Sequence, residues 1–283
     1  MKEKIEKQIE EMKKQTIGVE IEMNNITRMD AAKVVAAYFG TRPWYAARDY
    51  GYDACACKDR KDRVWKFQKD VSIAGPDSEK CEMVTPILTY DDIEDLQEIV
   101  RTLRKAGAKS DASRGCGVHI HVGANGHTPK TLRNLTNIMA SHESLIIEAL
   151  GIDNFRIDRY CQTVDPRFLK AVNKKKPQTM SQFADVWYEF KSPKDGKQNG
   201  LHAGQLKSYI QFCLALSQMA KEVSGASSKP QQNENPKYAM RTWLLRLGFI
   251  GEEFKTARET LTKNLRGDAS FRSGLRPALQ AAI

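Results

Sequence analysis

Alternating apolar and polar residues mark two segments as strands that bury one face. The first is TIGVEIEMN (16–24) and the second is GVHIHVG (117–123). Because successive side chains of a strand point to opposite faces, each segment separates its aliphatic residues from its glycines and chemically active residues. In the first strand, the face opposite the aliphatic residues holds Gly18, Glu20, Glu22 and Asn24. In the second strand, the corresponding face holds Gly117, His119, His121 and Gly123.

Start and stop signals predict the helices. Asp30 begins a helix that Gly40 ends, and Asp91 with Glu94 forms a capping box before the next one. Thr128, followed by proline, is a typical N-cap for a long helix. The expected helices are 1–15, 30–40, 91–106, 128–150, 180–190, 203–223, 236–249 and 251–265.

Three more strands are expected, at 44–54, 64–70 and 81–88, and Pro86 in the last of these indicates an edge or a bulge. The order of elements predicts an α+β fold, with a mostly antiparallel sheet covered by helices and a helical C-terminal part. We expect an N-terminal helical extension (1–15) and a single domain (16–283). This domain would consist of an α/β core (16–150) and a mostly helical completion (151–283).

The polar faces of the two alternating strands predict a ligand site. Glu20 and Glu22 lie about 6.6–7 Å apart along their strand, as do His119 and His121 along theirs. If the two strands share a sheet, four ligand-type side chains converge, and the flanking glycines leave room for a ligand. Asp70 and Glu82, at strand ends, add carboxylates. Such a set favours a hard cation, with Mg²⁺ the usual occupant when phosphates complete its coordination.

Each of these residues also has an ordinary structural interpretation. A Glu-x-Glu pair on a half-buried strand is commonly its solvated face. A strand histidine is commonly a satisfied core residue, although a His-x-His pair weakens that interpretation. Because the paired acids and paired histidines occur on strands in this order, one common site explains them better than separate structural roles.

Composition and charge limit the function classes. The chain of 283 residues carries a net charge of +10. Half of this charge lies in residues 166–200, which contain eight Lys and Arg but only three acidic residues. This basic segment could bind nucleic acid or an anionic substrate. We favour a solvated loop region, because no helix-turn-helix, RNA-stacking motif or zinc finger accompanies it.

The cysteines and the apolar runs indicate a reduced, cytoplasmic protein. The six cysteines show no paired CxxC spacing for zinc. No apolar run approaches the ~20 residues of a membrane span, and the charged N-terminus is not typical of a secretory signal. We therefore expect no membrane partner, and the sequence does not indicate an oligomeric state.

These residues, in this order, resemble the putative amidoligase family, which belongs to the carboxylate–amine ligases of glutamine-synthetase-like fold. The resemblance covers most of the chain, and the joint pattern is more specific than any one motif. The matching segments are TIGVEIEMN, KDVSI, CEMVTPILTYDDIEDLQEIVRTLRKAGA, CGVHIHVG, RYC, NGLHAGQLKSYIQFCLAL and NENPKYAMRTWLLRLGFIGEEF.

The resemblance implies ATP- and Mg²⁺-dependent amide formation between a small-molecule or peptide carboxylate and an amine, through an acyl phosphate. By similarity, the Mg²⁺ ligands would be Glu20, Glu22, Glu82 and His119. Contacts to the nucleotide would come from His119, His121, Gly18 and Gly117. The catalytic set, which includes residues that steady the substrate and its anionic groups, would be Asp70, Glu82, Arg156 and Arg159.

One departure from the family affects catalysis. Ahead of the LHAG stretch, the family has a strand resembling G-T-x-E-x-R-x-F-N, whereas this chain reads WYEFKSPKDGKQNGLHAG (187–204). The expected Glu-x-Arg pair is absent, and only Glu189 and Lys191 stand near its place, at an expected helix end. A lost phosphoryl-clamping arginine costs ~10³-fold or more in rate. Arg156, Arg159, Arg167 or a lysine of the basic segment could replace it.

Two other functions compete with the ligase. A degenerate, non-catalytic family member could use the basic segment to bind protein or nucleic acid. A metal-dependent hydrolase could use His119, His121 and the nearby acids around Zn²⁺ or Mn²⁺.

Overall fold

The computed structural model describes residues 2–152, 157, 162–190, 203–231 and 233–272. The chain forms two compact units. The sheet unit comprises Lys14–Gly123 and Lys197–Ile210, and the helical unit comprises Met1–Lys13, Ala124–Gly196 and Gln211–Ile283. The division expected at residues 15 and 150 stays a prediction.

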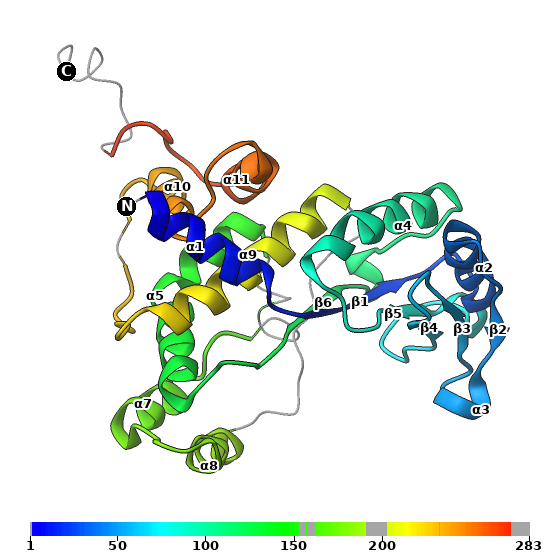
Figure 1. Cartoon of the computed structure of the whole chain (residues 1–283), viewed down its shortest axis with the longest axis horizontal. Coiled ribbons are helices and arrows are strands. Elements are labelled where there is room, and N and C mark those ends of the chain that lie inside the picture. The colour runs from blue at the N-terminus through cyan, green and yellow to red at the C-terminus, as the bar shows by residue number, and fades with distance from the viewer. Residues whose placement is uncertain (1, 153–156, 158–161, 191–202, 232, 273–283) are drawn as a thin grey trace. The chain divides into compact units, whose positions relative to one another are not determined.

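The sheet unit contains a six-stranded antiparallel sheet in the order β2-β3-β4-β5-β1-β6 (Figure 1). The expected α+β class with a mostly antiparallel sheet is confirmed. The strands are β1 (Ile17–Met23), β2 (Trp44–Tyr45), β3 (Cys55–Lys58), β4 (Val64–Gln68), β5 (Cys81–Val84) and β6 (Val118–Val122).

Helices α2 (Arg28–Phe39) and α4 (Ile93–Lys105) form a layer that covers the apolar face of this sheet (Figure 1). Helix α2 packs against β3, β4 and α4. The aliphatic residues of β1 are 0–2% exposed, as the alternation predicts. Burial of this face leaves the other face of the sheet to carry the polar side chains. The core contains Ile17, Val19, Ile21, Met23, Trp65, Phe67, Met83, Leu96 and Ile99.

Three predicted details of this unit are wrong. Helix α2 begins at Arg28, because Thr27 caps it by accepting a bond from the Asp30 amide. The capping box before α4 pairs Thr89 with Asp92 and starts a short 3₁₀ turn (Tyr90–Asp92). The predicted strand over 44–54 is interrupted by the four-residue helix α3 (Ala47–Tyr50).

Pro86 lies in a bulge, one of the two alternatives predicted for it. Strand β5 ends at Val84, which pairs with Glu20 of β1. Pairing with β1 resumes at a bridge between Ile17 and Leu88, one residue out of the earlier register. The extra residue accommodates a proline that cannot donate a ladder hydrogen bond.

The helical unit is built around long helices with strong caps. Helix α5 (Pro129–Leu150) begins after the Thr128 N-cap and ends at Leu150, as predicted, with Gly151 as its C-cap. Helix α9 (Ala203–Glu222) belongs to the sheet unit up to Ile210 and to the helical unit thereafter. The other helices are α1 (Lys2–Lys13), α7 (Pro166–Lys175), α8 (Met180–Phe190), α10 (Pro236–Arg246) and α11 (Lys255–Thr262).

In its described part (166–190), the basic segment contains helix α7, so our interpretation of this part as a loop region is wrong. Asp165 caps α7, and the helix packs against α8 through a small core of Phe168, Val172 and Val186. In the described part of the chain, no helix has both the length and the apolarity needed to cross a bilayer.

Candidate functional site

The register of the sheet brings the predicted site residues to one face. Glu20 of β1 lies opposite His119 of β6, and Gly18 lies opposite His121. On the other side of β1, Glu22 lies opposite Glu82 of β5. Directly opposed residues of an antiparallel pair point to the same face. We call this face, which carries Gly18, Glu20, Glu22, Gln68, Glu82, His119 and His121, the polar face.

Three carboxylates form an inner cluster on the polar face. One oxygen from each of Glu22, Asp70 and Glu82 lies within 4.8 Å of the others. Glu22 is fully buried and Glu82 is 7% exposed. Gln68 of β4, which lies opposite Glu82, donates a 2.8 Å hydrogen bond to its Oε2. The strand registers therefore fix two members of the cluster and the amide that orients one of them.

Asp70 enters the cluster from the loop after β4. Its Oδ1 accepts a 2.6 Å bond from the Ser72 amide, and the Ala74 amide donates to the Arg114 carbonyl at 2.8 Å. Gly115 has a positive φ of 79°, and a Cβ there would lie 2.5 Å from the Ser72 carbonyl oxygen. The loop that carries Asp70 can approach the segment before β6 this closely because position 115 is glycine.

A second cluster combines oxygen and nitrogen donors. One ligand atom from each of Glu20, His119 and His121 lies within 4.8 Å of the others. Nε2 of His121 is 3.4 Å from Oε1 of Glu20, and the two imidazole rings are nearly parallel, with centroids 6.4 Å apart. The His121 side chain is 61% exposed, so this outer cluster faces solvent whereas the inner cluster is largely buried.

The two donor sets suit different ions. Three carboxylates at mutual distances below 5 Å match the oxygen coordination of Mg²⁺ or another hard divalent cation. The outer cluster adds two imidazoles, which also suit Mn²⁺ and Zn²⁺. At an effective dielectric of about 20, two ionised carboxylates 4.8 Å apart repel by ~3.5 kcal/mol, so a divalent cation would stabilise the inner cluster.

The glycines of the two central strands contribute differently. A Cβ on Gly18 would lie 3.7 Å from that of His121, an ordinary contact, so sterics do not require glycine there. The carbonyl of buried Gly117 accepts a 2.9 Å bond from the Glu22 amide and helps fix the inner cluster. Contacts of Gly18 and Gly117 to a nucleotide stay predictions.

Of the remaining predicted site residues, three lie outside the described residues and one lies in helix α8. Arg156 and Arg159 lie outside the described residues, as does Lys191. Glu189 lies in the last turn of α8, as predicted, where its carboxylate forms a 2.7 Å ion pair with Lys175. Gln68 is a site residue that we did not predict, although the alternation of VWKFQ (64–68) places it on the polar face.

The cysteines of the sheet unit do not contribute ligands to either cluster. Cys55, Cys57, Cys81 and Cys116 are buried thiols. Burial raises the pKa of the Cys57 thiol to about 12, and that of Cys55 is raised for the same reason. Their inert thiols agree with the expectation of reduced cysteines.

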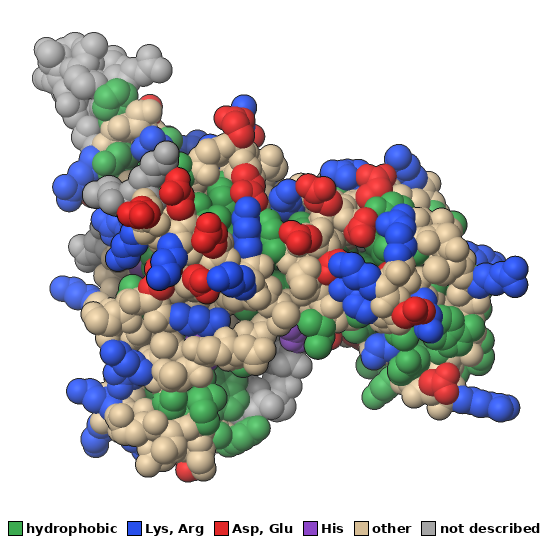
Figure 2. Space-filling model, in the orientation of Figure 1, with side chains coloured by type: hydrophobic (Ala, Val, Ile, Leu, Met, Phe, Trp, Pro, Cys, Tyr) green, Lys and Arg blue, Asp and Glu red, His purple; other side chains and the backbone are tan. Residues whose placement is uncertain are grey.

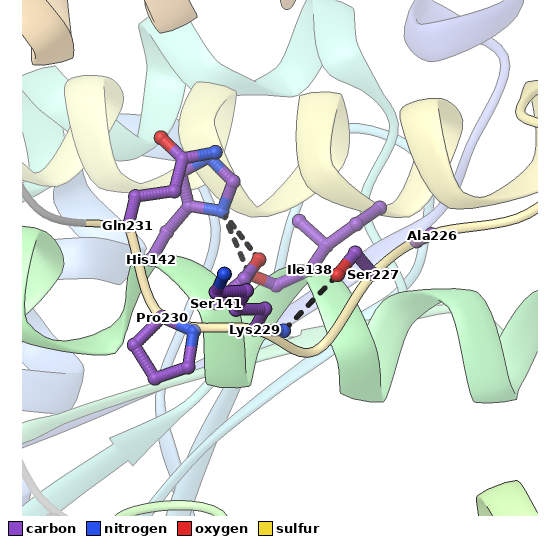
Figure 3. Close-up of a pocket in the computed structure, with 8 residues that line it drawn as sticks. All are labelled: Ile138, Ser141, His142, Ala226, Ser227, Lys229, Pro230 and Gln231. Carbon is purple, nitrogen blue, oxygen red and sulfur yellow. Dashed lines mark hydrogen bonds between the residues drawn. The ribbon is translucent and has the colours of Figure 1, made fainter.

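The helical unit contains a separate cavity of about 340 Å³ between α5 and the loop of residues 226–231 (Figure 3). Nδ1 of His142 donates a 3.0 Å bond to the Ile138 carbonyl, and its ring stacks on Trp243. Burial lowers the pKa of His142. None of the predicted site residues that the structure describes lines this cavity, so the polar face remains the candidate site.

Comparison with known proteins identifies a family. No curated protein and no solved structure matches the chain. The profile of the family described as putative amidoligase enzyme matches residues 13–217, which include both clusters and all six strands. Since this match covers well over half of the 283 residues, the chain belongs to the putative amidoligase family.

Proposed function

We propose that the protein is an ATP- and Mg²⁺-dependent carboxylate–amine ligase. Family membership supports ligase activity in general. The observation that carries the finer proposal is the pair of ligand clusters on one sheet face, three acids in one and an acid with two histidines in the other. A glutamine-synthetase-like fold and a cytoplasmic location, both expected from the sequence, are part of the same proposal.

The proposed reaction has two steps. An oxygen of the substrate carboxylate bonds to the γ-phosphorus of ATP while the bond to the β-phosphate oxygen breaks, which gives an acyl phosphate and ADP. The amine nitrogen then bonds to the acyl carbon, the carbon–oxygen bond to phosphate breaks, and the nitrogen loses one proton. The products are an amide, ADP and inorganic phosphate.

The residues of the polar face would position the phosphates for this transfer. Glu22, Asp70 and Glu82 would hold one Mg²⁺, and Glu20 with the two histidines would hold a second ion or a phosphate oxygen. Bound Mg²⁺ neutralises phosphate charge and orients the γ-phosphate for in-line attack. Gln68 would keep Glu82 oriented through their 2.8 Å hydrogen bond.

The missing Glu-x-Arg pair requires another cation near the transferring phosphoryl group. Lys175 holds Glu189 in an ion pair within the helical unit. We propose Arg156 and Arg159 for the role of anion clamp, because guanidinium groups bind phosphate oxygens through paired hydrogen bonds.

The deciding experiment is calorimetric titration of Mg·ATP into the wild-type protein, Glu22→Gln and Glu94→Gln. Glu94 is an exposed residue of α4, so its variant controls for loss of one carboxylate. We expect wild type and Glu94→Gln to bind Mg·ATP, and Glu22→Gln to lose at least tenfold in affinity. Absence of wild-type binding, or equal binding by all three proteins, would refute the proposal.

The structure also favours a non-catalytic binding role as a second candidate. Helix α8 exposes Trp187 (47%) and Tyr188 (69%), and the adjoining helix α7 with its C-cap carries Lys170, Lys174, Lys175 and Lys176 of the basic segment. This combination suits an acidic protein or a nucleic acid. An interaction that weakens with salt and is unchanged in Glu22→Gln would support this role, whereas salt-independent turnover of Mg·ATP would exclude it.

The outer cluster is the observation that supports the hydrolase hypothesis, because two histidines and a glutamate are a common ligand set for transition metals. Elemental analysis of protein purified without chelators would decide this point. A stoichiometric transition metal would favour a hydrolase, and its absence would favour the ligase.

A further inference from the structure

One straight row of residues crosses the polar face from the outer cluster to the far edge of the sheet. His119 lies opposite Glu20, and Glu20 lies opposite Val84. Val84 lies opposite Lys66, which is followed across β3 and β2 by Ala56 and Trp44. Because directly opposed residues share a face, Lys66 extends from the same surface as the ligand clusters.

Lys66 differs from the other charged residues of this face. It is half-buried, and its Nζ lies 5.0 Å from the centroid of the Tyr50 ring. Among the described residues, no carboxylate lies within ion-pair distance of Lys66. A cation held over an aromatic ring, on the same face as the ligand clusters and without a carboxylate partner, is arranged to meet an anion that the protein itself does not supply.

The segment that carries Tyr50 is held in place by hydrogen bonds. Arg28, itself 9% exposed, bonds to both the carbonyl and the carboxylate of Asp53, and Tyr45 donates a 2.6 Å bond to the same carboxylate. The Lys69 amide donates to the Tyr52 carbonyl at 3.0 Å. The position of Tyr50 beside Lys66 is therefore preorganised rather than dependent on a free loop.

The surface around Tyr50 is also unusually apolar. Tyr50 and Tyr52 are 37% and 71% exposed, and Trp44, which lies in the same row as Lys66, is half-buried. Figure 2 shows hydrophobic side chains gathered at the β2–α3 end of the sheet, with separate charged side chains around them. Exposed aromatic side chains beside a lysine suit the apolar part of a ligand whose charged end meets the lysine.

The row also sets the length of such a ligand. Neighbouring strands lie about 4.8 Å apart, so Lys66 is about 10 Å from Glu20 across two strand spacings. In extended peptide, about 10 Å corresponds to three residues. Val84 lies between the two positions, half-buried and apolar, and adds no competing charge.

We propose that Lys66 and Tyr50 form a subsite for a second anionic group of the carboxylate substrate, about 10 Å from the carboxylate that reacts. The substrate class is then an acidic peptide or a dicarboxylate of similar length. This inference rests on the proposed function, which places the reacting carboxylate at the ligand clusters.

The test compares two peptides that differ in one charge. Acetyl-Asp-Ala-Ala-Ala with a free C-terminus carries a side-chain carboxylate and a terminal backbone carboxylate about 10 Å apart when extended, and the same peptide with a C-terminal amide lacks the second charge. Each is titrated by calorimetry, with Mg²⁺ present, into wild type, Lys66→Met, Lys66→Arg and Lys33→Met. Lys33 is an exposed lysine of α2 that pairs with Asp30, so its variant controls for the loss of one positive charge.

We expect wild type to bind the dicarboxylate peptide about tenfold or more tightly than the monocarboxylate peptide. Lys66→Met should abolish this preference, whereas Lys66→Arg and Lys33→Met should retain it. The proposal is overturned if wild type shows no preference, if it binds neither peptide, or if the preference survives in Lys66→Met. It is also overturned if Lys66→Met weakens Mg·ATP binding instead, because the row would then hold the nucleotide.

Titration of Mg·ATP into the same proteins separates the two proposals. If Mg·ATP binds to wild type and the peptide preference is absent, the ligase proposal stands and the subsite fails. If the peptide preference depends on Lys66 while Mg·ATP does not bind, the subsite stands and the ligase proposal fails.

Discussion

Replacing Glu22 by glutamine should stabilise the metal-free protein while removing its response to Mg²⁺. Glu22 is fully buried, with carboxylate oxygens of Asp70 and Glu82 within 4.8 Å. Because both separations are 4.8 Å or less, each repulsion is at least ~3.5 kcal/mol at an effective dielectric of about 20. Since Gln68 and other hydrogen bonds already offset part of this repulsion, we expect a net gain of about 1–3 kcal/mol.

The assay is thermal unfolding monitored by circular dichroism, first with a chelator and then at increasing Mg²⁺. For a protein of this size, 1 kcal/mol corresponds to about 2–4 °C in Tm. With chelator, Glu22→Gln should therefore unfold about 2–12 °C above wild type. With Mg²⁺ at 100 times its Kd, wild type should gain about 2.7 kcal/mol, whereas the variant should gain nothing. The difference in Tm between Glu22→Gln and wild type should narrow or change sign as Mg²⁺ is added.

Glu94→Gln serves as the control, because this exposed carboxylate lies outside both clusters. Its Tm should stay within about 2 °C of wild type and rise with Mg²⁺ in the same way. A Glu22→Gln protein that is less stable than wild type in chelator would refute the reasoning, because the carboxylate would then be a structural hydrogen-bond acceptor rather than a metal ligand. An unchanged Mg²⁺ response in the variant would contradict the assignment as well.

Three further predictions concern parts of the fold around the sites. Gly115→Ala should push the Ser72 carbonyl outward and weaken Mg²⁺ binding at least tenfold by calorimetry, with little change in secondary structure by circular dichroism. Arg63→Met should lower the unfolding free energy in urea by about 3–5 kcal/mol, because buried Asp59 loses its 2.8 Å ion pair and buried Asp92 keeps only Lys61 as a cationic partner. Burial, and to a smaller extent the charge of Lys221, lowers the pKa of His127 from 6.5 to about 4. As the pH falls, His127 is therefore protonated in the unfolded chain before it is protonated in the folded chain. Unfolding free energy should then fall by about 1–2 kcal/mol, after allowance for solvent screening, between pH 6.5 and 4, and His127→Gln should flatten that dependence in urea titrations.

The alternation of β1 and β6 is sufficient to predict which side chains share a face, but not which ones meet. From the sequence alone, the two-residue periodicity of a strand places Glu20 and Glu22 on one face of β1, and His119 and His121 on one face of β6. The pairing of Glu20 with His119, and of Glu22 with Glu82, depends on strand order and register, which local sequence does not encode. The division into an inner and an outer cluster was therefore not predictable.

Asp70 shows a different limit of sequence analysis. Its position in the inner cluster depends on a loop that folds back to the segment before β6, a contact between residues 74 and 114. We expected Asp70 to add a carboxylate to the site, and its oxygen lies within 4.8 Å of one from Glu22 and one from Glu82. Its role on the substrate side, which the resemblance implies, stays a prediction. Long-range loop contacts of this kind leave no periodic signal in the sequence.

The two missed helices have local explanations. Ala47–Tyr50 is a single turn, too short for helical periodicity to appear. In Pro166–Lys175 the run of lysines hides an apolar stripe that contains Phe168 and Val172. Asp165 followed by Pro166 is a helix start signal that could have identified this helix.

The register that forms the site is also the register that forms the core. A slip of β1 by one residue would turn Glu20 and Glu22 into the layer beneath α2 and α4, and would expose the aliphatic residues that are now buried. Two features help hold the register against such a slip. The bulge at Pro86 offsets one side of β1, and on the other side Gly123 lies so close to Thr16 that a Cβ would collide with the Thr16 hydroxyl. Selection for a stable core therefore also maintains the convergence of acids and histidines, and a Gly123→Val change should damage the fold and the ligand clusters together.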